Sequence, residues 1–238
     1  MLSRALVSML PLVPRPVVWR ISRRYIAGEG LEDALDVVAE LNRHGISGTI
    51  DLLGEDSRSE AEARGSLEIY LRGLDEIARR EIDCNISVKL SQMGLRFDEG
   101  LCRAILRELL EAAEARRNFI RIDMEDSSVT GVTLEIYREL RAGSSAIGAV
   151  IQAYLRRSRA DIESLLDAPA NVRLCKGIYR EPAAIAFQDR KEIRDSFTEL
   201  LELLFSAGAR RVGIATHDAP LIDRARKMIQ KDEIPAER

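Results

Sequence analysis

The stretch VRLCKGIYREP, residues 172–182, decides the fold more than any other part of the chain. An apolar strand pattern runs into two basic residues and a glycine, and Pro182 ends it. Five further strand-like runs also end in polar or special residues: GTIDLLGE (48–55), NISVKLSQMGL (85–95), FIRIDMEDS (119–127), GAVIQAYL (148–155) and RVGIATHD (211–218). Buried strands that deliver polar groups at their carboxyl ends are typical of β/α-barrel enzymes.

Helical periodicity fills the segments between these runs. Leu31, Leu35 and Val38 fall at helical spacing, and Gly45 is placed to end that first helix. Further helices are expected over residues 57–83, 98–117, 130–141, 161–166, 193–207 and 220–229. Strict alternation of helices with strands that are apolar on both faces predicts a parallel sheet covered by helices.

Two architectures satisfy this alternation, a closed barrel and an open doubly wound sheet. No Gly-x-Gly-x-x-Gly follows the first strand, so the dinucleotide-binding signature of the open sheet is missing. Chemistry-bearing residues also follow six strands rather than one crevice, which favours the barrel. We therefore expect an α/β protein of the (β/α)8 TIM-barrel type, with about six strand–helix units in this chain.

The bulk composition describes a soluble protein of one domain. The chain has 238 residues, a net charge of −3 and 32% charged residues, which gives no case for nucleic acid as a partner. Its three cysteines have no short spacing, so neither a disulfide framework nor a metal site is expected. We interpret them as reduced thiols of a cytoplasmic chain, with Cys175 as a core residue. No apolar run approaches the ~20 residues that span a bilayer.

Residues 1–27 stand apart in charge, with five arginines and no acidic residue. We interpret them as a basic helical segment packed on a domain of residues 28–238. An alternative is a basic, apolar surface that rests on anionic lipid, which would make the protein peripheral at the inner face of the cell membrane.

Charged residues at the ends of the second and third strands need partners because strands of such a sheet are buried. Asp123 and Glu125 flank Met124, and strand alternation predicts that both carboxylates lie on one side. A solvated strand end is the alternative for this pair. Lys89 fits a barrel interior that opens on a ligand. A structural ion pair of Lys89 with Asp51 or Asp123 is the alternative.

Arg173 and Lys176 form the strongest basic pair of the sequence. Placed near one strand end, they suit an anion or a developing negative charge, which is compatible with packing of Arg173 against Asp123. Gly177 permits close approach of a ligand to the backbone. Tyr179 is expected to pack over a substrate or to cover the barrel mouth.

The last polar candidates follow the fourth and sixth strands. Gln152 has donor and acceptor groups that fit the edge of a ring, although a buried glutamine that bonds backbone is equally expected. Thr216 and His217 suit phosphate or ribose contacts, with a histidine that caps the next helix as the alternative. His44, at a helix end before Gly45, is interpreted as structural.

Six motifs together resemble the proline dehydrogenase family: GTIDLLGE, SVKLSQMGL, RIDMEDS, IQAYLRRS, RLCKGIYREP and ATHD. They occur in the family's order and cover nearly the whole chain from about residue 28. The resemblance implies a distorted β/α barrel that binds FAD. It also implies oxidation of L-proline to 1-pyrroline-5-carboxylate in proline catabolism, with electrons passed to a membrane quinone.

The resemblance also assigns roles to residues of this sequence, and no metal is implied. The catalytic pair is Asp123 and Arg173. The flavin is lined by Met124, Gln152, Lys176, Gly177 and Ile178. The rest of FAD contacts Thr216 and His217, and Lys89 and Tyr179 are expected to bind the substrate.

The chain departs from the family's pattern at its end. The family continues with two more strand–helix units, whose final helix carries an arginine pair and a glutamate that hold proline. This sequence ends at Arg238 without that motif, so we expect a C-terminal truncation with two exposed sheet edges and a thinner wall around FAD and proline. The alternatives are a Schiff-base aldolase that uses Lys89 or Lys176, and an inactive fragment.

Overall fold

A computed structural model of the chain describes residues 27–28, 30–54 and 56–235. The expected basic segment of residues 1–27 lies outside the described residues except for its last member. Six strands form one parallel sheet in the order β1-β2-β3-β4-β5-β6. The strands are β1 Gly48–Asp51, β2 Cys84–Val88, β3 Ile120–Ile122, β4 Ile147–Gln152, β5 Asn171–Cys175 and β6 Arg211–Ala215.

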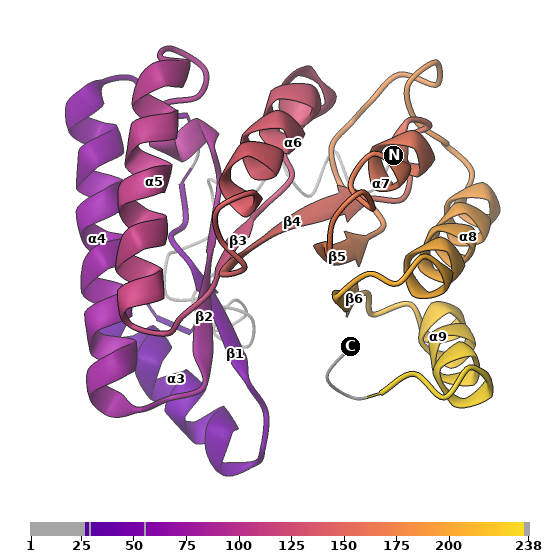
Figure 1. The fold of residues 1–238 in the computed structure, drawn as a ribbon, viewed down its shortest axis with the longest axis horizontal. Helices are drawn as coiled ribbons and strands as arrows, with labels where there is room; N and C mark the ends of the chain where they lie inside the picture. The colour runs from indigo at the N-terminus through magenta and orange to yellow at the C-terminus, as the bar shows by residue number, and fades with distance from the viewer. Residues whose placement is uncertain (1–26, 29, 55, 236–238) are drawn as a thin grey trace, which may run out of the picture.

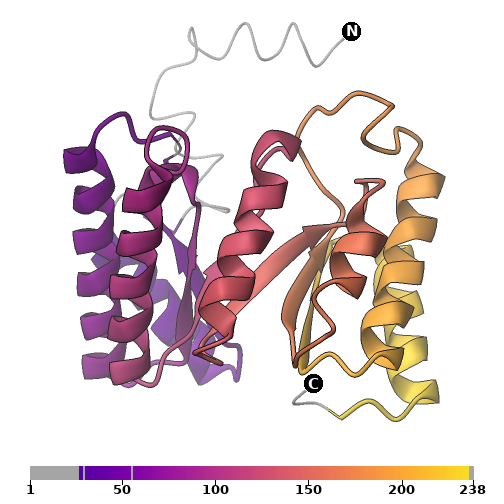
Figure 2. The ribbon, with the colours of Figure 1, turned by 45° about the horizontal axis from the view of Figure 1, so that its top comes forward.

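The sheet curls into a partial barrel, with helices along its convex side (Figures 1 and 2). The helices are α3 Leu31–Arg43, α4 Glu60–Arg80, α5 Glu99–Ala115, α6 Ser127–Arg141, α7 Ser158–Glu163, α8 Arg190–Ser206 and α9 Ala219–Lys231, with a short 3-10 helix, η2 Ser91–Met93. The expected α/β class and the alternation of strand and helix are confirmed. Among the described residues, β1 and β6 each pair with one neighbouring strand only.

One face of the sheet carries the hydrophobic core. Ile86, Ile120 and Val172 are fully buried between the strands and the helices that cover them. Alternate residues point to the concave face, where Arg121 of β3 donates to the side chain of Asn171 of β5. The expectation that the strands are apolar on both faces is therefore wrong, because the concave face is the interior of a barrel and carries polar side chains.

The strands end earlier than the sequence pattern predicts. The pattern extends each of β2 to β6 by one to three residues beyond its observed carboxyl end. These residues are 89–90, 123–124, 153–155, 176–177 and 216. Their side chains therefore belong to the loops at the carboxyl edge of the curled sheet, and not to the strands. In the described part of the chain, no helix has the length and apolar character needed to cross a membrane.

Candidate active site

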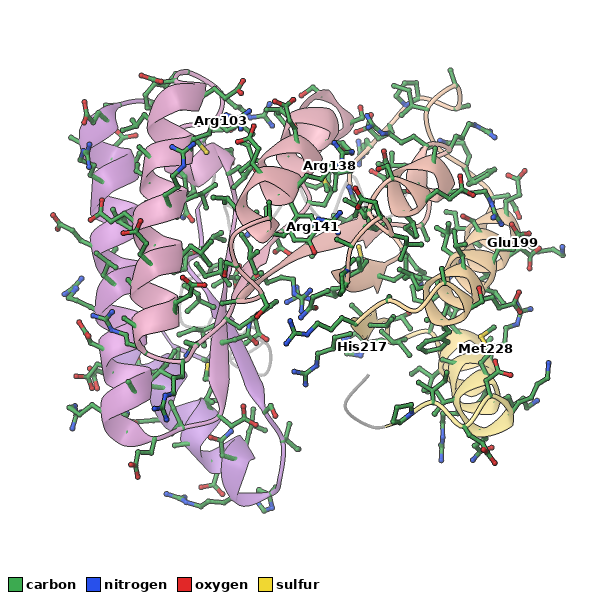
Figure 3. All side chains as sticks on the ribbon, in the orientation of Figure 1. Arg103, Arg138, Arg141, Glu199, His217 and Met228 are labelled. Carbon is green, nitrogen blue, oxygen red and sulfur yellow. The ribbon has the colours of Figure 1, made fainter. Side chains whose placement is uncertain are left out.

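A cavity of about 790 Å³ lies at the carboxyl ends of the strands. All eleven residues that the sequence marks as catalytic, cofactor-binding or substrate-binding line it. They are Lys89, Asp123, Met124, Gln152, Arg173, Lys176, Gly177, Ile178, Tyr179, Thr216 and His217. Figure 3 shows His217 beside β6, on the inner side of the curled sheet. The structure thus brings residues from five strand ends to one hollow.

Asp123 and Arg173 form an ion pair across the concave face. Arg173 Nη1 lies 3.2 Å from Asp123 Oδ1, and both side chains are half-buried. Burial raises the pKa of the Asp123 carboxyl, and the positive charges of Arg173 and Lys89 act against this rise. The packing of Arg173 against Asp123 that the sequence suggested is present, and both groups still face the cavity.

Lys89 is also held by a carboxylate. Its Nζ atom lies 3.1 Å from Oδ2 of Asp51, so the structural ion pair considered from sequence is formed. Lys89 lines the cavity at the same time, because it follows β2 directly at the rim.

The expected placement of Glu125 beside Asp123 is wrong. Glu125 is 2% exposed, and its carboxylate accepts hydrogen bonds from the Ser91 backbone N–H at 2.9 Å and from the Ser91 hydroxyl. Strand alternation does not reach this far, because β3 ends at Ile122. Glu125 therefore anchors the turn at η2 and does not line the cavity.

The contacts of Gln152 and the cap of α9 decide two questions that the sequence leaves open: whether Gln152 bonds backbone and whether His217 caps a helix. Gln152 is buried and donates from Nε2 to the Glu125 carbonyl at 2.8 Å, so the backbone bond is present although the side chain also lines the cavity. The residue that caps α9 is Asp218, and Thr216 Oγ1 accepts from the Asp218 N–H at 3.1 Å. His217 therefore does not cap the helix.

Three charged residues of the cavity were missed from sequence: Arg190, Arg194 and Asp218. Asp218 is held by two cations, because its Oδ2 accepts from Arg194 Nε at 3.0 Å and from Lys176 Nζ at 3.1 Å. The hydrogen bond from Arg194, and to a smaller extent the one from Lys176, holds the pKa of Asp218 below its usual range. The sequence did contain a sign of this cluster, because Arg190 and Arg194 lie one turn apart at the start of the helix that follows β5.

This end of the cavity carries a surplus of positive charge. Lys176, Arg190 and Arg194 line it beside one carboxylate, Asp218, which pairs with Lys176 and Arg194. Guanidinium and ammonium groups around one pocket suit a phosphate or another anion. The electrostatics therefore favour a ligand with a negatively charged part at the α8–α9 side.

Cys175 lines the cavity but is not set up as a nucleophile. Burial raises the pKa of its thiol to about 11, so the protonated form dominates at neutral pH. The core role expected from sequence holds only in part, because Cys175 is half-buried in the cavity wall.

Gly177 provides a direct test of how the cavity wall is built. Its φ is +104°, and an added Cβ would lie 2.1 Å from the Tyr154 ring. Gly177→Ala is expected to lower the free energy of unfolding by about 2–4 kcal/mol, because it adds backbone strain and a steric overlap. Denaturant unfolding followed by circular dichroism measures the change.

Gly208→Ala is the matched control, since Gly208 has φ +77° but no atom within 4 Å of an added Cβ. It should cost only the backbone strain, about 1 kcal/mol. Equal losses in the two variants would show that Tyr154 does not restrict the wall at Gly177.

A curled parallel sheet with charged side chains at the carboxyl ends of several strands defines a β/α-barrel enzyme. A family model described as proline dehydrogenase matches residues 34–238. The chain belongs to the proline dehydrogenase family, whose members are flavoenzymes that act on proline. The family resemblance drawn from the six motifs is thereby confirmed.

Relatives and solved structures agree with this assignment. Proline dehydrogenase 1 of Bacillus subtilis subsp. natto is 38% identical over 215 residues, a match that covers 90% of this chain and 71% of the relative. The proline dehydrogenase of Deinococcus radiodurans is 35% identical over 222 residues, with the same two coverages. A crystal structure of proline utilization A from Bdellovibrio bacteriovorus, inactivated by N-propargylglycine, has a TM-score of 0.85 at 24% identity. It covers 92% of this chain, which spans only 28% of that protein, so this likeness supports the fold alone.

Proposed function

We propose that this chain is an FAD-dependent proline dehydrogenase that oxidises L-proline to 1-pyrroline-5-carboxylate and passes the electrons to a quinone. The observation that carries the proposal is the cavity itself. Eleven residues chosen from sequence line one hollow, with the Asp123–Arg173 pair in its wall. Membership of the proline dehydrogenase family supports the oxidation of proline as the reaction, and the cavity is the proposed active site.

The lining of the cavity fits FAD. Its volume of about 790 Å³ lies in the range of cofactor pockets, roughly 300–1,000 Å³. Met124, Val150 and Ile178 offer apolar surface for a planar ring, and Gln152 offers a polar edge. The cations at the α8–α9 side suit the phosphates. When bound, FAD would supply the redox chemistry by accepting two electrons from proline and passing them to the quinone.

The reaction forms a C=N bond in the ring of proline. The ring carbon next to nitrogen that does not carry the carboxylate would lose a hydride to the flavin, and the nitrogen would lose its proton to solvent. Arg173 would stabilise the negative charge that develops on the flavin as it is reduced. The ion pair with Asp123 would hold Arg173 in position, and Lys89, itself paired with Asp51, would contact the substrate.

The purified chain tests this assignment against the aldolase alternative. A proline dehydrogenase is expected to be yellow as isolated, or to take up added FAD with a change in flavin fluorescence. A colourless protein that fails to bind FAD, but is trapped by borohydride with a carbonyl compound, would instead identify a Schiff-base enzyme. The trapped lysine would be located by mass spectrometry.

The quinone partner implies contact with a membrane, and we assign this contact to residues 1–27. Five arginines without an acidic residue support attraction to anionic lipid. The chain is expected to co-sediment with vesicles that contain anionic lipid, and removal of residues 1–25 should abolish most of the binding. Equal sedimentation of the two forms would contradict this role.

A further inference from the structure

Arg121 of β3 is a buried cation outside the set of proposed site residues. It is 9% exposed, and its Nη1 donates to Asn171 Oδ1 at 2.9 Å while its guanidinium carbon lies 4.8 Å from the centre of the Phe119 ring. Among the described residues, no carboxylate lies within ion-pairing distance of Arg121, and its Nε has no hydrogen-bond partner. Burial of an unpaired charge is costly, so this arrangement calls for a function.

The neighbouring strand leaves room for this arginine. Arg121 pairs in register with Gly148 of β4, and a Cβ on Gly148 would lie 2.6 Å from Arg121 Nη1. The side chain therefore crosses β4 and reaches Asn171 at the start of β5.

Because Arg121 bonds to Asn171, the position of Asn171 on β5 shows where the guanidinium group of Arg121 lies relative to the cavity. Asn171 and Arg173 are successive inward-facing residues of β5, about 7 Å apart along a strand. The guanidinium group of Arg121 thus lies one layer below Arg173, on the side away from the cavity mouth.

The charges of this layer do not cancel. Arg173 has Asp123 as its partner, whereas Arg121 has no partner of opposite charge in the described part of the chain. Burial first, and then the positive charge of Arg173, lower the pKa of Arg121 to about 10, which leaves it charged at neutral pH. The concave face beneath the cavity therefore carries an excess positive charge.

We propose that Arg121 is a positioning residue of the active site, whose uncompensated charge below Arg173 favours negative charge on the group bound above it. The inference rests on the proposed function, in which that group is the flavin. Arg121 acts through the electric field around Arg173 and Asp123 and makes no contact with the ligand.

The reduction potential of bound FAD measures this effect. Two unit charges roughly 10 Å apart, at an effective dielectric constant near 20, change an equilibrium constant about tenfold. Arg121→Met is therefore expected to lower the equilibrium constant for two-electron reduction about tenfold, a shift of about 30 mV to more negative potential. Arg121→Lys keeps the charge and should stay near the original potential.

Asn171→Asp gives the same test without removing Arg121. It places a carboxylate within hydrogen-bond distance of the guanidinium at nearly unchanged shape, so the potential should again become more negative. Arg211→Met is the matched control. Arg211 pairs in register with Asn171 but is exposed, so solvent should screen its charge and the potential should change less than about twofold in equilibrium constant.

Titration of the Asp123 carboxyl by carbon-13 NMR tests the charge without any flavin. Arg121→Met and Asn171→Asp are both expected to raise the pKa of Asp123, because a nearby cation favours the ionised carboxylate. Arg211→Met should leave it unchanged. Folded variants with an unchanged Asp123 titration would overturn the inference whether or not flavin binds, whereas a failure to bind FAD alone would count against the proposed function.

Discussion

Arg173→Met is expected to lower the turnover of proline by about 100-fold or more, the scale of losing one preorganised electrostatic donor. The substitution keeps much of the side-chain volume but removes the guanidinium that lies 3.2 Å from Asp123. Steady-state rates with proline and an artificial electron acceptor measure the change. Flavin content and the far-ultraviolet circular dichroism spectrum establish that the variant is folded and loaded.

Two further substitutions separate the role of Arg173 from the general loss of an arginine and from the loss of positive charge alone. Arg180→Met removes an exposed arginine of the loop after β5 that does not line the cavity, and it should leave turnover within about twofold. Arg173→Lys keeps the charge but loses the planar fork, so an intermediate rate is expected. Arg173→Met with nearly normal turnover would remove Arg173 from the catalytic pair.

Glu125→Ala is expected to lower the free energy of unfolding by about 3 kcal/mol. The substitution leaves the backbone N–H and the hydroxyl of Ser91 without their acceptor in a buried position, and each such loss costs about 1–3 kcal/mol. Ser91 Oγ also accepts the Asp56 N–H at 3.3 Å, so the loop after β1 should loosen as well. Denaturant unfolding and amide hydrogen exchange measure the two effects.

Glu139→Ala is the matched control for Glu125→Ala. The Glu139 side chain is 46% exposed and pairs with Arg103, and surface ion pairs of this kind contribute about 0–1 kcal/mol. A loss at Glu125 no larger than the loss at Glu139 would contradict the anchoring role of Glu125.

The elements of the fold follow from periodicity because helices and strands bury different spacings of apolar residues. In α3, Leu35 and Val38 are buried as their spacing predicts, and Gly45 has the φ of +72° that ends the helix. The ends of the strands were placed too late, because Lys89 and Asp123 continue the alternation after the hydrogen-bonded pairing stops. Pairing depends on the neighbouring strand, which a single sequence does not specify.

The gathering of the candidate site residues was predictable where they lie at or near the carboxyl ends of strands. Asp123, Gln152 and Arg173 gather at one rim because parallel strands end together. The direction of Glu125 and the clamp of Asp218 on Lys176 were not predictable, because both depend on partners 34 and 42 residues away. Contacts of that kind become visible only once the curled sheet has brought the ends of its strands together.

Anaerobic addition of L-proline to the FAD-loaded chain tests most directly whether the cavity is the active site of a proline dehydrogenase. Bound flavin should lose its visible absorbance on mixing with L-proline, while the Arg173→Met variant should bleach about 100-fold more slowly or not at all. Flavin that binds and stays oxidised with saturating L-proline, or that bleaches equally fast in the variant, would contradict the assignment.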